Sequence, residues 1–183
     1  EKKLLYPPYP ASKDLCAMGG IVNNNSGGEK TLAYGKTEDY VEEVDIVMAD
    51  GEFHHIVPLS GVALEAKMKE AGFEGDIYRK LRTLIEANYD AIRHAKPDVS
   101  KNSAGYFLWN VWDKTTFNLV KLIVGSQGTL GLLTEAKLRV VPKKAYSRLV
   151  VIFAHSLAPV PKLVETLLPF HPARIESYDD RTL

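Results

Sequence analysis

The chain has 183 residues, of which 45% are hydrophobic and 25% charged, and its 23 basic and 23 acidic residues leave no net charge. This composition is typical of a globular chain with a core, and it provides no basic field for nucleic acid or an anionic membrane. The single cysteine, Cys16, excludes a disulfide framework within the chain and a thiolate metal cluster, and it fits the reducing cytoplasm in which we expect the protein.

Two further features of the whole chain bear on its context. No apolar run approaches the roughly 18 residues of a membrane-spanning helix, so we expect no transmembrane segment. The first residue is Glu1 rather than Met, and no secretory signal precedes the globular part. We therefore expect this sequence to be a fragment of a longer polypeptide.

The N-terminal segment is predicted to be extended and then helical. Each residue before a proline within residues 4–10 is pushed out of the helical region of backbone conformation. Ser12 and Asp14 are candidate caps of a short helix that leads into the following segment.

Residues 18–28 contain two pairs of glycines on either side of three consecutive asparagines, and Tyr34 and Gly35 follow. Glycine lets the backbone approach a ligand closely and adopt positive φ, and asparagine tolerates the same left-handed region. The segment can therefore present bare N–H and C=O groups to a bound molecule. A tight connection in an ordinary loop explains the same residues equally well.

A β-hairpin is predicted for residues 41–49 and 52–57. Apolar and polar residues alternate in the first stretch, and Asp50-Gly51 favours a two-residue turn. The pairs across such a turn are Met48 with Phe53, Ile46 with His55, and Val44 with Val57. The adjacent His54 and His55 point to opposite faces of the strand, so they do not jointly hold a metal ion. Structural histidines are the favoured interpretation, and we expect no metal site.

Residues 61–96 are interpreted as a helical insertion that Pro97 ends. A short apolar stripe is broken by Gly72 and Gly75, a longer stripe follows, and charged residues occupy the opposite side. The stripes consist of Leu64, Met68 and Ala71, and then of Ile77, Leu81, Leu84, Ile85 and Ile92. We interpret them as core and the charges as a solvated face.

A second glycine cluster places Gly125, Gly128 and Gly131 before a strand at residues 132–141, and a short helix at residues 117–124 leads into it. Neither cluster fits a phosphate loop that ends in Gly-Lys-Ser/Thr. Neither has the strand and helix context of a nicotinamide-binding GxGxxG motif.

Taken together, the two clusters resemble the FAD-linked oxidase family, which includes vanillyl-alcohol oxidase, p-cresol methylhydroxylase, glycolate oxidase and D-lactate dehydrogenases. The family's flavin domain has a GGxVxNNxxG…YG segment, matched by residues 19–35, and a GSEGTLGxxTEAxLRxVP segment, matched by residues 125–142. Gln127 stands where the family has Glu, which removes a charge. Ala17-Met18 replaces a family threonine, and the lost hydrogen bond is worth on the order of 1 kcal/mol.

The resemblance implies an α+β fold in which an antiparallel sheet and flanking helices form the second subdomain of an FAD-binding domain, residues 1–142. An apolar strand at residues 149–153, a helix from Val160 to Leu168 and a strand at residues 173–178 resemble the start of the family's substrate (cap) domain, residues 146–183, cut short. The subdomain that holds the FAD pyrophosphate and most of the cap domain have no counterpart in this sequence.

The resemblance also implies which residues line the FAD site. Those near the pyrophosphate and ribityl chain are Ala11, Ser12, Ala17, Gly19 and Gly20. Those near the flavin ring are Asn24, Asn25 and Gly27. The backbone of the second cluster contributes Gln127, Gly128, Thr129, Leu130, Gly131, Leu132 and Leu133. No catalytic residue is assigned.

A third segment, residues 99–112, resembles a (Lys/Arg)-x-x-(Ser/Ala)-Gly-Tyr-x-Leu stretch in one branch of large flavin dehydrogenases. Under this interpretation, Lys101 and Asn102 face the flavin or the substrate. A surface lysine beside a turn is an equally favoured interpretation.

The implied function is that of an FAD-dependent oxidoreductase that oxidises a small 2-hydroxy acid such as D-lactate or glycolate and reduces an unidentified acceptor. Since the pyrophosphate subdomain has no counterpart here, we expect this chain alone to be inactive and to bind FAD weakly. The alternative is a non-catalytic domain that uses the fold for protein association.

Overall fold

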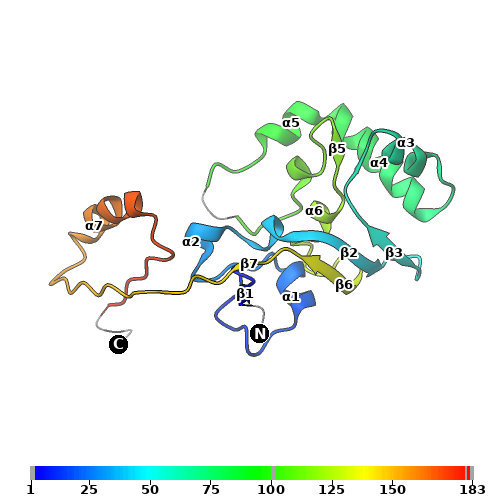
Figure 1. Cartoon of the computed structure of the whole chain (residues 1–183). Coiled ribbons are helices and arrows are strands. Elements are labelled where there is room, and N and C mark those ends of the chain that lie inside the picture. The colour runs from blue at the N-terminus through cyan, green and yellow to red at the C-terminus, as the bar shows by residue number, and fades with distance from the viewer. Residues whose placement is uncertain (1–2, 100–101, 180, 182–183) are drawn as a thin grey trace.

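A three-stranded antiparallel sheet lies at the centre of the fold, with strand order β3-β2-β6. The computed structural model describes residues 3–99, 102–179 and 181 (Figure 1). The strands are β2 (Val41–Val47), β3 (Phe53–Ile56) and β6 (Leu132–Leu138). Helices and antiparallel pairs together confirm the predicted α+β class, and the three strands lie where the alternation of residues predicted them, with slightly shorter bounds.

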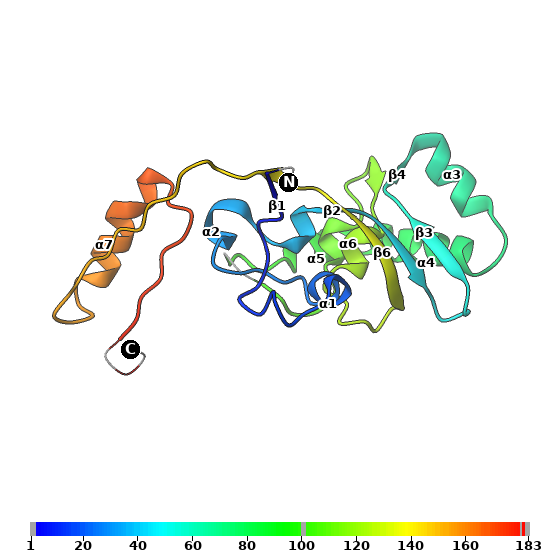
Figure 2. The same ribbon diagram turned by 60° about the horizontal axis from the view of Figure 1, so that its bottom comes forward.

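One face of this sheet is buried and the other is open. Val44 and Ile46 are each 1% exposed, whereas Phe53 on the opposite face is 73% exposed. The helices α1 (Met18–Asn23) and α6 (Val120–Ile123) contact β6 and β2, and they bury Val22, Val120 and Ile123 in the same core (Figure 2). Burial of apolar side chains on one face is what the alternation predicted. The helix predicted for residues 117–124 is confined to α6, because Phe117 belongs to a strand.

Three helices form the predicted helical region: α3 (Gly61–Lys69), α4 (Phe73–Ala87) and α5 (Tyr89–His94). They stand above the sheet in Figure 1. The short strand β4 (Leu59–Ser60), which directly precedes α3, pairs antiparallel with β5 (Thr116–Phe117). Two predictions were wrong here. Gly75 lies inside α4, packed so that a Cβ would be 2.1 Å from the Glu70 carbonyl oxygen. Ala71 and Leu84 are exposed and do not belong to the core.

The hairpin between β2 and β3 has a three-residue turn rather than the predicted two-residue turn. The Met48 N–H donates to the Glu52 carbonyl at 3.3 Å, and the Gly51 N–H donates to the Met48 carbonyl at 3.0 Å. Gly51 has φ +80°, so the turn is of type I followed by a left-handed glycine. The Asp50-Gly51 pair is compatible with both turn lengths, and the extra residue shifts the register by one.

The shifted register changes which side chains share a face. The observed pairs are Val44 with Ile56, Asp45 with His55, Ile46 with His54, and Val47 with Phe53. The predicted pairs Met48–Phe53, Ile46–His55 and Val44–Val57 were therefore wrong. As a consequence, His54 lies on the buried face at 9% exposure, and Phe53 faces solvent.

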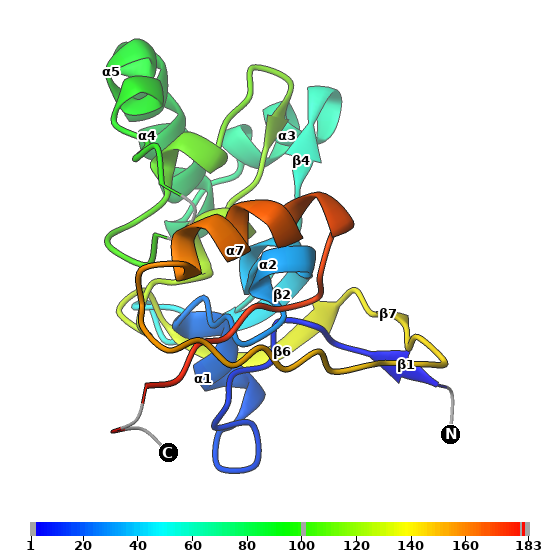
Figure 3. The same ribbon diagram turned by 90° about the vertical axis from the view of Figure 1, so that its left-hand side faces the viewer.

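The N-terminal strand pairs with a strand that directly follows the central sheet in the chain. β1 (Leu4–Leu5) pairs antiparallel with β7 (Val141–Pro142), as Figure 3 shows. Residues 11–15 then form turns, and α1 begins only at Met18, with Ala17 at its N-cap and no side-chain capping bond. The predicted helix capped by Ser12 or Asp14 is therefore wrong. Short helices follow at α2 (Thr31–Tyr34), Thr37–Asp39 and Leu108–Asn110.

Residues 143–179 extend away from the sheet (Figures 1 and 2). The helix α7 (Val160–Leu167) and a short turn of helix at Leu168–Phe170 form as the apolar spacing predicted, yet α7 contains no buried residue. The strands predicted at residues 149–153 and 173–178 do not form within the described residues. A strand needs a partner for its N–H and C=O groups, and the side chains from Leu149 to Phe153 are at least 49% exposed.

Candidate functional site

The two glycine segments, far apart in the sequence, contact each other through their backbones. The Gly125 N–H donates to the Val22 carbonyl at 3.1 Å, and the Gln127 N–H donates to the Asn23 carbonyl at 2.8 Å. The Gln127 side chain also donates from Nε2 to Oδ1 of Asn24 at 3.3 Å. The structure therefore places the residues from both motifs at one location, beside the C-terminal end of α1.

Gly19 and Gly20 lie in the first turn of α1, with helical backbone rather than positive φ. A Cβ on Gly20 would meet no atom within 4 Å, and one on Gly19 would meet only Leu133, at 4.0 Å. Glycine inside a helix is less favourable than alanine by about 0.5–1 kcal/mol. Neither backbone conformation nor packing within the described residues explains these two glycines. They leave a strip of bare backbone that a ligand can approach closely.

Other glycines of the motifs are required by the fold itself. Gly131 has φ +155°, and a Cβ there would lie 2.5 Å from the Val47 carbonyl oxygen in β2. A Cβ on Gly28 would lie 2.1 Å from the Tyr9 carbonyl oxygen, and one on Gly27 would lie 2.6 Å from the Thr31 hydroxyl. These positions are glycine because neighbouring parts of the chain press against them.

The asparagines differ in the same way. Asn25 is 1% exposed and has φ +46°, and its Oδ1 accepts a hydrogen bond from the Glu38 N–H at 2.9 Å. Asn24 is exposed, and its Nδ2 donates to Oγ of Ser26 at 3.0 Å. Asn25 therefore positions the loop. Two buried atoms, Asn23 Oδ1 and Asn25 Nδ2, have no hydrogen-bond partner among the described protein groups, and a buried polar group left this way is destabilising by about 1–3 kcal/mol.

The remaining predicted site residues take varied positions. Ala17 precedes the glycines of α1, whereas Ala11 and Ser12 lie in an exposed turn closed by a bond from the Leu15 N–H to the Ser12 carbonyl at 2.8 Å. Gly128 lies beside Asn23, with its Cβ position 3.9 Å from Nδ2. Leu133 lies under Gly19, and Leu130 packs against the core, whereas Leu132 is 73% exposed.

Of the third segment, Lys101 lies outside the described residues. The carbonyl of Asn102 accepts a hydrogen bond from Nζ of Lys36, a residue that is only 5% exposed. Tyr106 contacts Thr129 of the second glycine segment. Lys36 was not among the predicted site residues, and Tyr106, although part of the motif of the third segment, was given no role. The position of Lys36 directly after Tyr34-Gly35 was the available signal.

The two histidines of the hairpin are held by carboxylates on opposite faces of the sheet, as predicted. His54 contacts Oε2 of Glu74 and Oδ2 of Asp50, each at 3.0 Å, and His55 contacts Oδ1 of Asp45 at 2.5 Å. Burial lowers the pKa of His54, but the hydrogen bonds and charges of Glu74 and Asp50 outweigh it, so that this pKa lies above its ordinary value. Within the described part of the chain, no three potential ligands gather to hold a metal ion.

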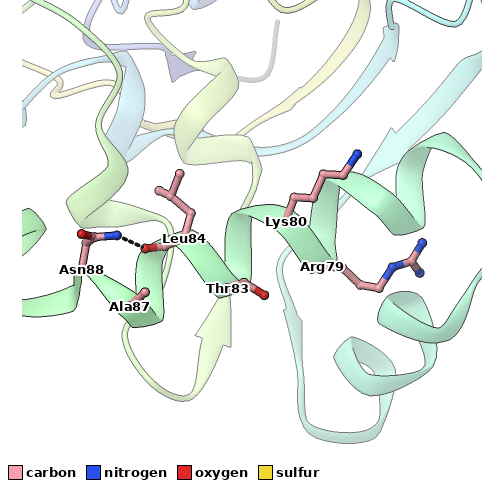
Figure 4. A pocket seen from close by; sticks show the side chains of 6 residues that line it. All are labelled: Arg79, Lys80, Thr83, Leu84, Ala87 and Asn88. Atoms are coloured by element: carbon pink, nitrogen blue, oxygen red, sulfur yellow. Dashed lines mark hydrogen bonds between the residues drawn. The ribbon is translucent and has the colours of Figure 1, made fainter.

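A shallow hollow on the outer face of α4 is not a candidate site. Its lining comes from that helix and its C-cap residue Asn88, and Figure 4 shows Asn88 donating to the Leu84 carbonyl, a bond of 2.9 Å. The lining residues are Arg79, Lys80, Thr83, Leu84, Ala87 and Asn88. The guanidinium of Arg79 already donates hydrogen bonds to the carbonyls of Met68 and Glu70.

No helix of the described residues is both long and apolar enough to cross a membrane.

Comparison with known families assigns the class of protein. Residues 1–56, which include the first glycine segment and the β2–β3 hairpin, match the family described as FAD binding domain. Together with the relatives described next, this match confirms that the chain resembles the FAD-linked oxidase family, as the two motifs predicted.

The curated relatives place the chain more closely. It is 31% identical over 181 residues to D-2-hydroxyglutarate dehydrogenase of Pseudomonas putida, and the aligned region covers 98% of this chain and 18% of that protein. It is 28% identical over 184 residues to glycolate oxidase subunit GlcD of Bacillus subtilis, covering all of this chain and 28% of that protein. It is 32% identical over 139 residues to D-lactate dehydrogenase of Anaerostipes hadrus, covering 76% of this chain and 18% of that protein.

Proposed function

We propose that this chain forms one side of the FAD site in an oxidoreductase that oxidises a small 2-hydroxy acid. The observation that carries the proposal is the strip of bare backbone at Gly19 and Gly20, which the fold leaves open beside the second glycine segment. The names of the relatives support the substrate class, since 2-hydroxyglutarate, lactate and glycolate are all 2-hydroxy acids. The electron acceptor is a separate, unidentified molecule.

FAD, when bound, accepts the hydride from the substrate, and the protein orients and shields it. In our proposal, the amides and bare surface at Ala17, Gly19 and Gly20 hold the pyrophosphate and ribityl chain, with Ala11 and Ser12 at the outer end. Asn24 and Gly27 lie near the flavin ring, and Asn25 positions them through its bond to Glu38. The backbone of residues 127–133 provides the facing wall.

We further propose a division of the chain. Residues 1–142 form the second subdomain of the FAD-binding domain, with a helical insertion at residues 61–96, and residues 146–183 begin the cap domain. The exposed apolar residues 149–153 and the amphipathic helix α7, which has no buried residue, support this division, because apolar side chains of this kind are normally covered. A cytoplasmic location is part of the proposal, and the free thiol of Cys16 is compatible with it.

The test is an absorbance scan of the purified chain followed by calorimetric titration with FAD. We expect a colourless protein that binds FAD with a dissociation constant of about 10⁻⁴ M or weaker, roughly −5 kcal/mol, because the pyrophosphate subdomain has no counterpart in these residues and binding must offset lost ligand freedom. A form of the protein that contains that subdomain should be yellow, and a 2-hydroxy acid should bleach its flavin band.

Two results would contradict this account in different ways. A stoichiometric, sub-micromolar complex of FAD with the chain alone would show that the two glycine segments suffice and that the site is not divided. Failure of every form to bind FAD would overturn the function and favour a non-catalytic domain for protein association.

A further inference from the structure

We propose that residues 102–106 form a third wall of the FAD site and that Tyr106 is the residue that positions this wall. The inference rests on the proposed function, because it concerns the same site. It comes from contacts at both ends of the segment, which link it to the two stretches that carry the glycine motifs.

The first end of the segment is fixed by a buried lysine. Nζ of Lys36 donates to the Asn102 carbonyl at 2.5 Å and to Oγ of Ser103 at 2.9 Å. An ammonium group with this little exposure needs hydrogen-bond acceptors, and the segment supplies two of them. Since Lys36 directly follows Tyr34-Gly35, this contact joins the segment to the stretch that carries the first glycine motif.

The second end is fixed by Tyr106. Its hydroxyl lies 2.6 Å from Oγ1 of Thr129, which in turn donates to the Ser126 carbonyl at 2.6 Å. A threonine hydroxyl has a single proton, and Thr129 uses it toward Ser126. Tyr106 is therefore the donor. The bond ties the segment to the second glycine motif.

The residues between these two contacts are small and uncovered. Ser103, Ala104 and Gly105 are all exposed, and a Cβ on Gly105 would meet no atom within 4 Å. The φ of +70° at Gly105 accounts for a glycine there. The open space beside it gives the turn the same bare backbone surface as Gly20. Small residues of this kind allow a flat ligand to approach the main chain.

The three segments therefore form a closed ring of contacts. Lys36 joins the first motif to residues 102–103, Tyr106 joins this segment to Thr129, and Gln127 joins the second motif back to Asn23. A ring that is already assembled needs less ordering when a ligand binds. In the described structure, the bond of Tyr106 is the side-chain hydrogen bond that joins this segment to the second glycine motif, so breaking it opens the ring at that point.

The test uses this chain, FAD as the probe, and Tyr106→Phe, which removes only the hydroxyl. We expect this variant to bind FAD about five-fold more weakly, the size of one hydrogen bond. Tyr146→Phe is the matched control, since Tyr146 is 89% exposed, and it should leave the affinity unchanged. Thr129→Val should weaken FAD binding as Tyr106→Phe does, whereas Thr129→Ser, which keeps the hydroxyl, should bind FAD as the wild type does. The double variant Tyr106→Phe with Thr129→Val should bind FAD no more weakly than either single variant.

A second measurement separates a site wall from a purely structural latch. FAD should slow hydrogen exchange of the backbone amides in residues 103–107 of the wild type and protect them less in Tyr106→Phe. If the wild type binds FAD while Tyr106→Phe keeps its affinity and residues 103–107 gain no protection, this inference is overturned and the proposed function stands. If the wild type and the longer protein both fail to bind FAD, the proposed function falls and the inference falls with it.

Discussion

Gly131 and Gly20 belong to the two motifs of one family, yet they lie in regions that use glycine for different reasons. Directly before β6, Gly131 has a left-handed backbone and lies so close to β2 that a Cβ would be 2.5 Å from the Val47 carbonyl oxygen. In the first turn of α1, Gly20 has helical backbone and open space around it. The first glycine is required by the fold, and the second becomes understandable only when a ligand is present. A motif of this kind mixes both roles, and only the structure separates them.

The largest expected effect is at the position that the fold requires. Gly131→Ala should destabilise the protein by about 3 kcal/mol or more, because the methyl group meets backbone rather than a flexible side chain and the φ is unfavourable for alanine. The measurement is the free energy of unfolding in urea. A loss below about 0.5 kcal/mol would show that β2 and β6 can separate without penalty. It would contradict the claim that the fold requires glycine at position 131.

Two adjacent asparagines of the first motif differ in the same way as the two glycines, and substituting them leaves every glycine in place. Asn25→Ala should destabilise by about 2 kcal/mol, because it leaves the Glu38 N–H without its acceptor and puts alanine at positive φ. Asn24→Ala, the matched control at an exposed position, should change stability by less than about 0.5 kcal/mol. Equal losses for both variants, measured by denaturant unfolding, would contradict the distinct roles assigned to the two residues.

A smaller effect concerns pH and the hairpin that carries Val47. Burial lowers the pKa of His54, but the hydrogen bonds and charges of Glu74 and Asp50 raise it above its ordinary value in the folded state. The stabilisation that protonated His54 gives to the fold is therefore fully present below the unfolded pKa of about 6.5. It is lost as the pH rises through the folded pKa. The thermal midpoint should therefore fall between about pH 6 and about pH 8, and less so in His54→Asn. An identical slope in wild type and variant would assign the pH dependence to other groups.

Parts of this fold could be predicted from the sequence because they depend on local patterns. The strand β2 was found because one of its faces is buried, which imposes alternation. In β6 the signal was weaker in burial, since Leu133, Ala136 and Leu138 are only half-buried against the core. The register of the hairpin was not, because Asp50-Gly51 suits turns of two or three residues. The apolar run at residues 149–153 predicted a strand that does not form, because the described residues offer that stretch no partner strand.

The site divides in the same way. The motifs correctly predicted that residues 19–27 and 125–133 come together, since both match one family pattern. The roles of Lys36 and Tyr106 could not be predicted, because each depends on a contact between residues far apart in the chain, 66 positions for Lys36 and Asn102 and 23 for Tyr106 and Thr129. A single lysine or tyrosine has no periodicity that would reveal such a contact.

The most direct test of the central claim is Gly20→Ala, measured for both stability and FAD affinity. A helical position with open space should accept alanine, so we predict that the free energy of unfolding stays the same or rises by up to about 1 kcal/mol. FAD affinity should nevertheless fall at least about five-fold, roughly 1 kcal/mol, because the methyl group occupies the strip that the ligand approaches. A variant that gains stability and binds FAD as tightly as the wild type would show that the bare backbone at α1 is not part of the site.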